Sequence, residues 1–277
     1  YFRRGSLVNR CRNELLAYFL ESTNLDYIFF IDSDIVNFDK AYHYIVQRYF
    51  ELEQKLPDIP FILGAAYPIK HYNFDVAKDT RLRDWVQGTL NYNINHPHLY
   101  TENEPLILQE ASRSNGIVEV TDIGGGFMMF SKKTLMKMIQ TYPDTKYKRF
   151  FNNKNIPEDT LYNLFHSFVD KESGYYLSED YGFCYLLRNM GGRIFADITV
   201  ELNHLGDVAF SGSLMKSLQV QQYWETSNIL FGAPYNTPSS LGAHSNSGTS
   251  SAFVSKATSE RTSNHNSRNI SRAETPI

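Results

Sequence analysis

Asp32 and Asp34 follow directly after five apolar residues, and their type and spacing suit the binding of a cation. Residues 27–31 are rich in aromatic and β-branched side chains, which is typical of a strand buried on both faces of a sheet. Ligands bind beyond the carboxyl ends of such strands. Two carboxylates there repel each other, and a divalent cation relieves this repulsion. The pair therefore predicts a Mg²⁺ or Mn²⁺ site; the alternative is a strand-end turn in which Asp acts as a cap.

Two carboxylates and a histidine later in the chain provide further reactive groups. Glu179 and Asp180 open a helical segment, where the helix dipole favours negative charge. Either carboxylate is also suited to act as a general base that takes a proton from a hydroxyl nucleophile. His204 follows a strand-like segment, so it is either a core histidine or a third metal ligand beside the two aspartates.

Basic residues and a glycine run are candidate contacts for a phosphate-bearing ligand. Arg12 and Asn13 adjoin apolar positions on the sheet-facing side of the first helical segment, and Arg10 or Arg12 could bind phosphate through the guanidinium group. The alternative is a solvated basic face. A second candidate contact is the glycine run at Gly124, Gly125 and Gly126. It allows close approach of a backbone to a ligand, although a β-bulge is the simpler explanation.

Local patterns predict the helices and strands that position these residues. Helices are expected at 6–23, with Ser6 as N-cap, at 39–56, at 131–139, with Ser131 as N-cap, and at 179–190. Strands are expected at 27–31, 61–66, 116–123, 193–197 and 200–203. A helix between two strands implies a right-handed crossover, so we expect an α/β fold with a mostly parallel sheet flanked by helices. Residues 70–115 are polar and are expected to form surface loops, with a hairpin around 85–91.

Composition limits the class of protein. The 277 residues, 42% of them hydrophobic, are enough for one large domain, which we assign to residues 1–235. The net charge of −3 argues against bulk nucleic-acid binding, and no apolar run is long enough for a membrane span. The two cysteines, Cys11 and Cys184, give no disulfide framework, so we expect a reducing, cytoplasmic location. Residues 236–277 are rich in Ser, Thr, Asn and Gly and are expected to be a disordered tail.

The order of these motifs resembles the nucleotide-sugar-dependent glycosyltransferases of the GT-A fold, especially viral and bacterial members. An Arg-Asn helix, an apolar strand ending in Asp-x-Asp, a triple-glycine loop, a Glu-Asp helix and an Asn-His-Leu-Gly segment follow one another between roughly residues 6 and 206. The resemblance implies a Rossmann-like sheet and a metal-dependent transferase. Its donor is a nucleotide sugar, and its acceptor is a glycan, a protein or a small molecule. The first strand of that fold is absent from this sequence, so we expect the N-terminus to be incomplete.

The resemblance also implies roles for single residues. Asp32 and Asp34 match the motif that holds Mn²⁺ or Mg²⁺ against the donor diphosphate, with Ser33 close to the ribose. His204 matches a further metal ligand, and Asp180 matches the catalytic base of inverting members. Glu179 is the neighbour of this base, and the triple-glycine run matches the loop that floors the acceptor site. The sequence lacks the Gln-x-x-Arg-Trp block of the processive polysaccharide synthases, which argues against that branch.

Two other functions fit part of the pattern. The run from Asp32 to Val36 also fits the nucleophile motif of haloacid-dehalogenase-type phosphatases, in which Glu179 and Asp180 would form the distal acidic pair. The helix before this motif and the late histidine are not needed for phosphatase chemistry. The second alternative is a non-catalytic module that binds a sugar nucleotide or a glycan.

Overall fold

The computed structural model describes residues 7–22, 24–74, 82–99, 101, 103–148 and 160–231. Its helices are α1 (Val8–Ser22), α2 (Asp39–Lys55), α3 (Leu82–Gly88), α4 (Glu104–Arg113), α5 (Lys132–Thr141), α6 (Glu179–Asn189) and α7 (Leu214–Phe231), with a 3-10 turn at Pro143–Thr145. The predicted cap Ser6 and the predicted tail at 236–277 lie outside the described residues. Within them, no helix combines the length and the apolar character needed to cross a membrane.

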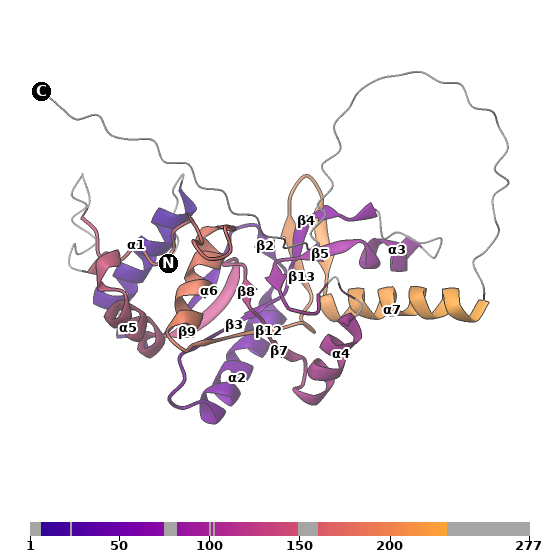
Figure 1. Ribbon diagram of the computed structural model, residues 1–277, viewed down its shortest axis with the longest axis horizontal. Coiled ribbons are helices and arrows are strands. Elements are labelled where there is room, and N and C mark those ends of the chain that lie inside the picture. The colour runs from indigo at the N-terminus through magenta and orange to yellow at the C-terminus, as the bar shows by residue number, and fades with distance from the viewer. Residues whose placement is uncertain are drawn as a thin grey trace, which may run out of the picture. The chain divides into compact units, whose positions relative to one another are not determined.

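A five-stranded mixed sheet forms the centre of the protein (Figure 1). Its strand order is β1 (Tyr27–Ile31), β9 (Phe127–Ser131), β3 (Phe61–Ala65), β12 (Arg193–Asp197) and β7 (Ile117–Glu119). Only β3 and β12 pair in parallel; the other three neighbouring pairs are antiparallel. The expectation of a mostly parallel sheet is therefore wrong. The predicted crossover does make β1 and β3 run in the same direction, but β9 lies between them and runs the opposite way.

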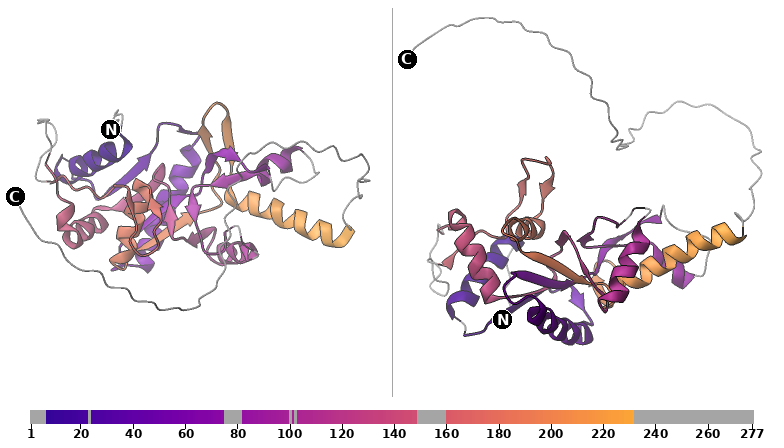
Figure 2. Two further views of the ribbon diagram at one scale, coloured as in Figure 1. Left: turned by 45° about the horizontal axis from the view of Figure 1, so that its top comes forward. Right: turned by 60° about the horizontal axis from the view of Figure 1, so that its bottom comes forward.

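Side chains that alternate along the central strands fill two cores, one on each face of the sheet. On one face, Ile62 and Phe130 pack with residues of α1, α5 and α6. On the other face, Leu63 and Phe127 pack with the buried stripe of α2, which includes Ile45. Figure 2 shows the helices on the two sides of the sheet. Both faces are therefore covered, which explains why β3 and β9 are buried at every residue.

Smaller sheets extend the edge at which β1, β3 and β12 end. The three-stranded one has the order β14 (Ala209–Gly212), β13 (Leu202–Leu205) and β2 (Ile35–Val36), and it pairs His204 with Ile35. Three two-stranded sheets comprise β4 (Pro68–Tyr72) with β5 (Leu90–Tyr92), β6 (Ile94–Asn95) with β8 (Asp122–Ile123), and β10 (Phe168–Val169) with β11 (Tyr176–Leu177). The β2–β13 pairing brings the segment after Asp34 beside His204, although the two are far apart in the sequence.

Most elements with a strong local pattern are confirmed within one or two residues, including α1, α2, α6 and β12. Ser131 caps α5 as predicted, because its side chain accepts a hydrogen bond from the Thr134 amide. The interpretation of residues 70–115 is wrong. Helix α3 lies where a hairpin was expected, and α4 lies where a loop was expected. These short helices bury only a few residues each, so their apolar periodicity is weak in the sequence.

Candidate functional site

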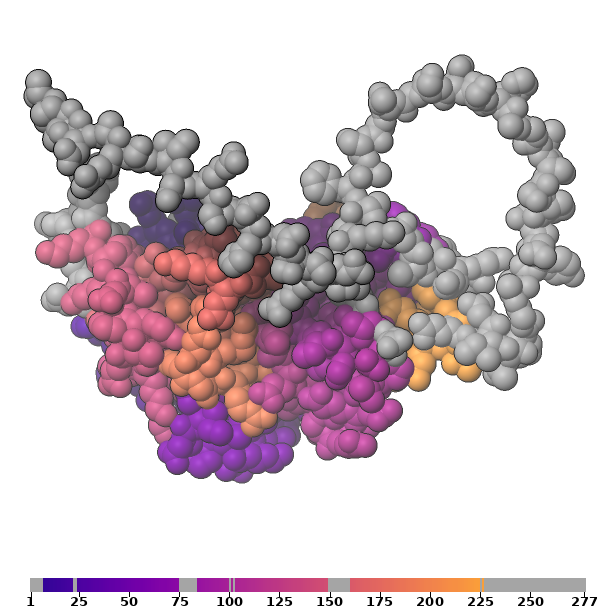
Figure 3. Space-filling model, in the orientation of Figure 1, coloured from indigo at the N-terminus to yellow at the C-terminus, as the bar shows by residue number. Residues whose placement is uncertain are grey.

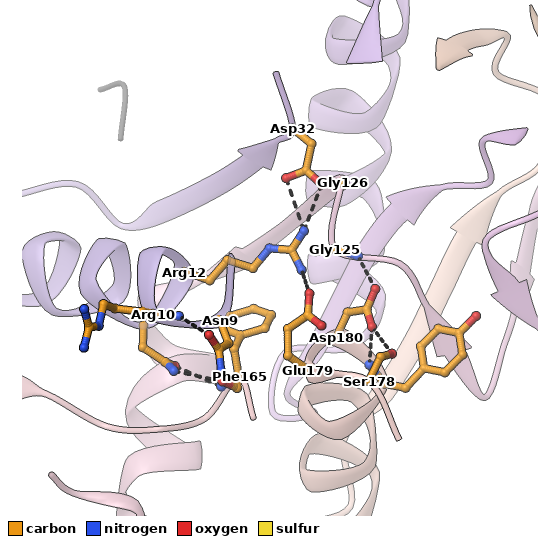
Figure 4. A network of polar contacts seen from close by, with 12 residues as sticks. Asn9, Arg10, Arg12, Asp32, Gly125, Gly126, Phe165, Ser178, Glu179 and Asp180 are labelled. Atoms are coloured by element: carbon orange, nitrogen blue, oxygen red, sulfur yellow. Dashed lines mark hydrogen bonds and ion pairs between the residues drawn. The ribbon is translucent and has the colours of Figure 1, made fainter. Parts of the chain in front are cut away.

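Arg12 joins three segments of the chain at the end of β1 (Figure 4). Its guanidinium donates hydrogen bonds to Glu179 Oε1 at 2.7 Å and to Asp32 Oδ2 and Oδ1 at 2.9 and 3.2 Å. The Arg12 side chain is only 6% exposed, and its charge lies 5.7 Å from the centre of the Phe165 ring. Burial would lower the pKa of Arg12, but the neighbouring carboxylates of Asp32 and Glu179 raise it above its ordinary value. Arg12 is thus a buried, permanently charged link between α1, the turn after β1 and α6.

The triple-glycine loop lies directly against this link. A Cβ added at Gly125 would lie 2.4 Å from Arg12 Nη1, and one at Gly126 would lie 2.5 Å from the Tyr67 hydroxyl. The Gly126 amide donates to the Tyr67 hydroxyl at 3.1 Å, and the Gly126 carbonyl accepts from the Asp32 amide at 2.9 Å. The loop therefore needs glycine because side chains from three other segments occupy the space beside it.

Glu179 and Asp180 have different surroundings although they are neighbours at the start of α6. Asp180 accepts from the Gly125 amide at 3.2 Å, from the Tyr181 amide at 2.9 Å and from the Ser178 hydroxyl. Glu179 is bound by Arg12 through Oε1, and its side chain is 17% exposed. Burial and the charge of Asp180 raise the pKa of Glu179, although Arg12 opposes the rise. Asp180 is therefore oriented by three donors, while Glu179 is held by Arg12 and has a raised pKa.

Asp34 and His204 form a second polar group beside the Arg12 link. Asp34 Oδ2 lies 2.6 Å from Lys70 Nζ and 3.4 Å from His204 Nε2. His204 Nδ1 lies 2.9 Å from the Pro68 carbonyl oxygen, and because a carbonyl only accepts, Nδ1 carries the hydrogen. Burial raises the pKa of Asp34, but the hydrogen bond and charge of Lys70 outweigh it, so the pKa lies below its ordinary value. Lys70 thus favours the ionised form of Asp34, and Nε2 of His204 faces the same carboxylate oxygen.

This pair, rather than the predicted triad, has the donor chemistry of a cation site. Asp32 is bound by Arg12 through both oxygens, and the described residues contain no group of three or more acidic, histidine or cysteine side chains arranged to hold a metal. Asp34 and His204 are close enough to contact one ion. The hydrogen bond to Pro68 orients the imidazole as the second shell of a metal site does. An ion held by these two side chains would take its remaining ligands from substrate phosphates and water.

Comparisons with known proteins add little to this geometry. No protein-family model matches the chain, and no curated protein matches it. One solved structure that matches is the crystal structure of A197 from STIV, with 18% sequence identity, 74% of this chain and 71% of that chain covered, and a TM-score of 0.36. A similarity of this size carries no argument about function. The conclusions below therefore depend on the residues of this chain.

Three of the predicted ligand-binding residues lie outside the Arg12 link. Arg10 is exposed on α1 and points away from Asp32 and Glu179 (Figure 4). Asn13 is buried, and its amide exchanges hydrogen bonds with the Phe165 backbone at 2.9 Å in both directions. Ser33 is exposed in the turn between the two aspartates. Asn13 thus fixes α1 to residues 163–165, and this contact holds Arg12 in position.

Tyr67 and Lys70 belong to the site although the sequence did not single them out. Tyr67 is 7% exposed and lies edge-on to His204, with ring centres 5.3 Å apart. Burial raises the pKa of Tyr67, and Asp32 raises it further, so the phenol stays neutral. Both residues follow β3, which ends at the same edge of the sheet as β1. The expectation that β1 and β3 run in the same direction was therefore the sequence signal that could have identified Tyr67 and Lys70.

Proposed function

We propose that the chain is a cation-dependent transferase that moves a sugar from a nucleoside-diphosphate sugar to an acceptor hydroxyl. One observation carries the proposal: Arg12 connects the Asp-x-Asp turn, the glycine loop and the Glu-Asp helix, and it lies 167 positions before Glu179 in the sequence. Such a meeting of carboxylates and a buried cation at the end of strands is a usual setting of a ligand site in α/β proteins.

The donor side of the site consists of Asp34, His204 and Lys70. A divalent cation bound by Asp34 and His204 would act as a Lewis acid that neutralises the diphosphate leaving group. Lys70 is about two-fifths exposed, and its ion pair with Asp34 is weak enough to be exchanged for a phosphate contact. Asp32, held by Arg12, remains available to the donor only through its exposed edge, which is 39% accessible.

The acceptor side consists of the Glu-Asp helix and the glycine loop. In the proposed reaction the acceptor oxygen attacks the anomeric carbon, the bond from that carbon to the diphosphate breaks, and Asp180 takes the acceptor proton. Three donors orient Asp180, which supports a positioned base. Glu179 holds Arg12 in place and has a raised pKa. It is therefore the second candidate for the general base, and its variant is compared with that of Asp180.

Binding and turnover measurements test the proposal. A panel of nucleotide sugars is scored by thermal shift and by donor hydrolysis, with Mn²⁺ and with chelator. Asp34→Asn is expected to abolish the Mn²⁺-dependent shift and leave the fold intact. Asp180→Asn is expected to keep donor affinity and lose most turnover, whereas Glu179→Gln loses less. Asp58→Asn, which changes a fully exposed carboxylate on the surface, is the matched control and is expected to behave as the wild type.

Two results would redirect the proposal. Hydrolysis of a generic phosphate ester with trapping of a phosphoenzyme on Asp32, and no response to any nucleotide sugar, would identify a phosphatase instead. Both oxygens of Asp32 accept hydrogen bonds from Arg12, which does not favour Asp32 as a free nucleophile. Metal-dependent donor binding without turnover under any condition would identify a binding module.

A further inference from the structure

A polar cavity lies on the opposite side of the small sheet from His204. It has a volume of about 850 Å³, which is within the range of ligand-binding cavities. Side chains of α2 form one wall, and residues 111–116 together with 199–203 form the other. Figure 3 shows α2 in purple and α4 in magenta standing on either side of a hollow. A separate hollow of about 620 Å³ between the same two helices shares Asn115 with this cavity.

The floor of this cavity is fixed by a buried ion pair. Arg48 Nε lies 2.8 Å from Asp197 Oδ2, and the two side chains are 11% and 0% exposed. Arg48 also donates to the carbonyl of Asn115, and Asp197 accepts from the amide and hydroxyl of Thr199 at 2.8 and 2.6 Å. Buried charges are retained only when they are paired in this way. Because Arg48 of α2 contacts Asp197 and Asn115, it links the two walls of the cavity.

Above this floor, hydrogen-bonding groups remain open. The side-chain amides of Asn37, Asn115 and Asn203 line the cavity and have no hydrogen-bond partner within the described part of the chain. Asn37 and Asn115 have φ values of 57° and 58°, a left-handed backbone conformation that asparagine adopts more readily than most residues. An amide offers donors and an acceptor together, which matches a sugar hydroxyl that both donates and accepts. The 55% exposed ring of Tyr44 adds an apolar surface on the same wall.

The cavity also has an unbalanced positive charge. Arg48 is neutralised by Asp197, and Glu201 by Lys216 at 2.5 Å. Lys40 also lines the cavity, and it has no charged partner among the residues that the structure describes. Lys40 lies in the first turn of α2, where the helix dipole disfavours a positive charge. A contribution to helix stability therefore does not explain the presence of lysine at this position. An anionic group in the cavity would be favoured by both the ammonium of Lys40 and the helix terminus.

This cavity is distinct from the candidate catalytic site. Asn203 and His204 are neighbours on β13, and successive side chains of a strand point to opposite faces. His204 contacts Asp34 on one face, while Asn203 lines the cavity on the other. We propose that the cavity is a binding site for an acidic carbohydrate, with Lys40 contacting its carboxylate, Tyr44 its ring face and the three amides its hydroxyls. The proposal does not depend on the transferase reaction.

Two matched disaccharides test it: cellobiose, and cellobiouronic acid, which replaces one hydroxymethyl group by a carboxylate. Binding to the full chain is measured by ligand-observed NMR, with inorganic phosphate as a competitor. Cellobiouronic acid is expected to bind about tenfold more tightly than cellobiose, the effect of one charge-assisted hydrogen bond. Lys40→Gln is expected to remove this preference, and Tyr44→Ala to weaken the binding of both sugars. Lys133→Gln, on the exposed surface of α5, is the control and is expected to change nothing.

Four results would overturn the proposal. The first is the absence of binding by either disaccharide, and the second is binding that Lys40→Gln and Tyr44→Ala leave unchanged. In the third, phosphate competes as well as cellobiouronic acid, which would indicate a general anion site. Loss of binding in Asp34→Asn alone would assign the sugar to the candidate catalytic site and refute the second site. Both α2 variants change exposed side chains, so circular dichroism is expected to show an unaltered fold.

Discussion

Replacing Arg12 by Met removes the charge that joins the three segments of the site and keeps most of the side-chain volume against Phe165. A hydrogen bond to a charged group contributes about 1.5–3 kcal/mol, and the Glu179 contact, with a carboxylate that is 17% exposed, is assigned about 2 kcal/mol. The Asp32 contact is discounted to about 1 kcal/mol because that carboxylate is 39% exposed to water. We therefore expect Arg12→Met to lower the free energy of unfolding by about 3 kcal/mol at neutral pH.

The assay is a double-mutant cycle in urea. Unfolding free energies of the wild type, Arg12→Met, Glu179→Gln and the double variant isolate the Arg12–Glu179 term from the other effects of each change. The expected coupling is about 1.5–2 kcal/mol, since Gln retains part of the hydrogen bond but not the charge. The cycle with Asp32→Asn in place of Glu179→Gln is expected to give a smaller coupling, because water replaces Arg12 more readily at Asp32.

A coupling of less than about 0.5 kcal/mol between Arg12 and Glu179 would refute this reasoning, because contacting residues in one network normally exceed that value. The order of the two couplings is a second check. If Asp32 coupled more strongly than Glu179, burial would not be what determines the strength of the link.

Three further changes test other parts of the structure. Ser131→Ala removes the side-chain cap of α5 and is expected to cost about 1 kcal/mol of stability, whereas Ser131→Asp restores most of it; equal stability of the two variants would exclude the cap. Gly125→Ala forces a methyl group into the space of the Arg12 guanidinium and is expected to destabilise by about 1–3 kcal/mol; an unfolding free energy equal to that of the wild type would show that the loop is free to move. Folded Glu179 binds its proton up to a higher pH than in the unfolded chain, so its contribution to stability falls as the pH rises from the ordinary glutamate value through the raised pKa. In this pH window, the slope of the unfolding free energy against pH is expected to be less negative in Glu179→Gln than in the wild type. A slope identical to that of the wild type would contradict the raised pKa of Glu179.

Elements with a complete local signal were predictable from the sequence. The apolar run before Asp32, the Pro57 that ends α2 and the Ser131 cap each specify their element within a few neighbouring residues. The order of the strands was not predictable in the same way. Whether β9 pairs with β1 or lies elsewhere depends on contacts between residues about 100 positions apart, such as Tyr27 with Ser131, and no local pattern encodes them.

The membership of the candidate site was predictable only in part, and its pairings were not. Arg12, Asp32 and Glu179 were each identified by residue type and position, and the structure brings them into contact. The sequence did not show that Arg12 would bind Asp32 and so separate it from Asp34, because that depends on where the packing of α1 directs one side chain. Asn13 illustrates the same limit, since its position beside Arg12 suggested ligand binding while its amide is bonded to the Phe165 backbone.

The pairing of β1 with β9 has a consequence for synthesis of the chain. At about 5–20 residues per second, the ribosome needs several seconds or more to make the residues between Tyr27 and Ser131. During this time residues 27–31, Tyr-Ile-Phe-Phe-Ile, have neither their β9 partner nor any charge or proline of their own. Apolar strands of this kind associate with other chains when left unpaired. The nascent protein therefore has a period of vulnerability to aggregation, which ends only when the strand that follows the glycine loop has left the ribosome.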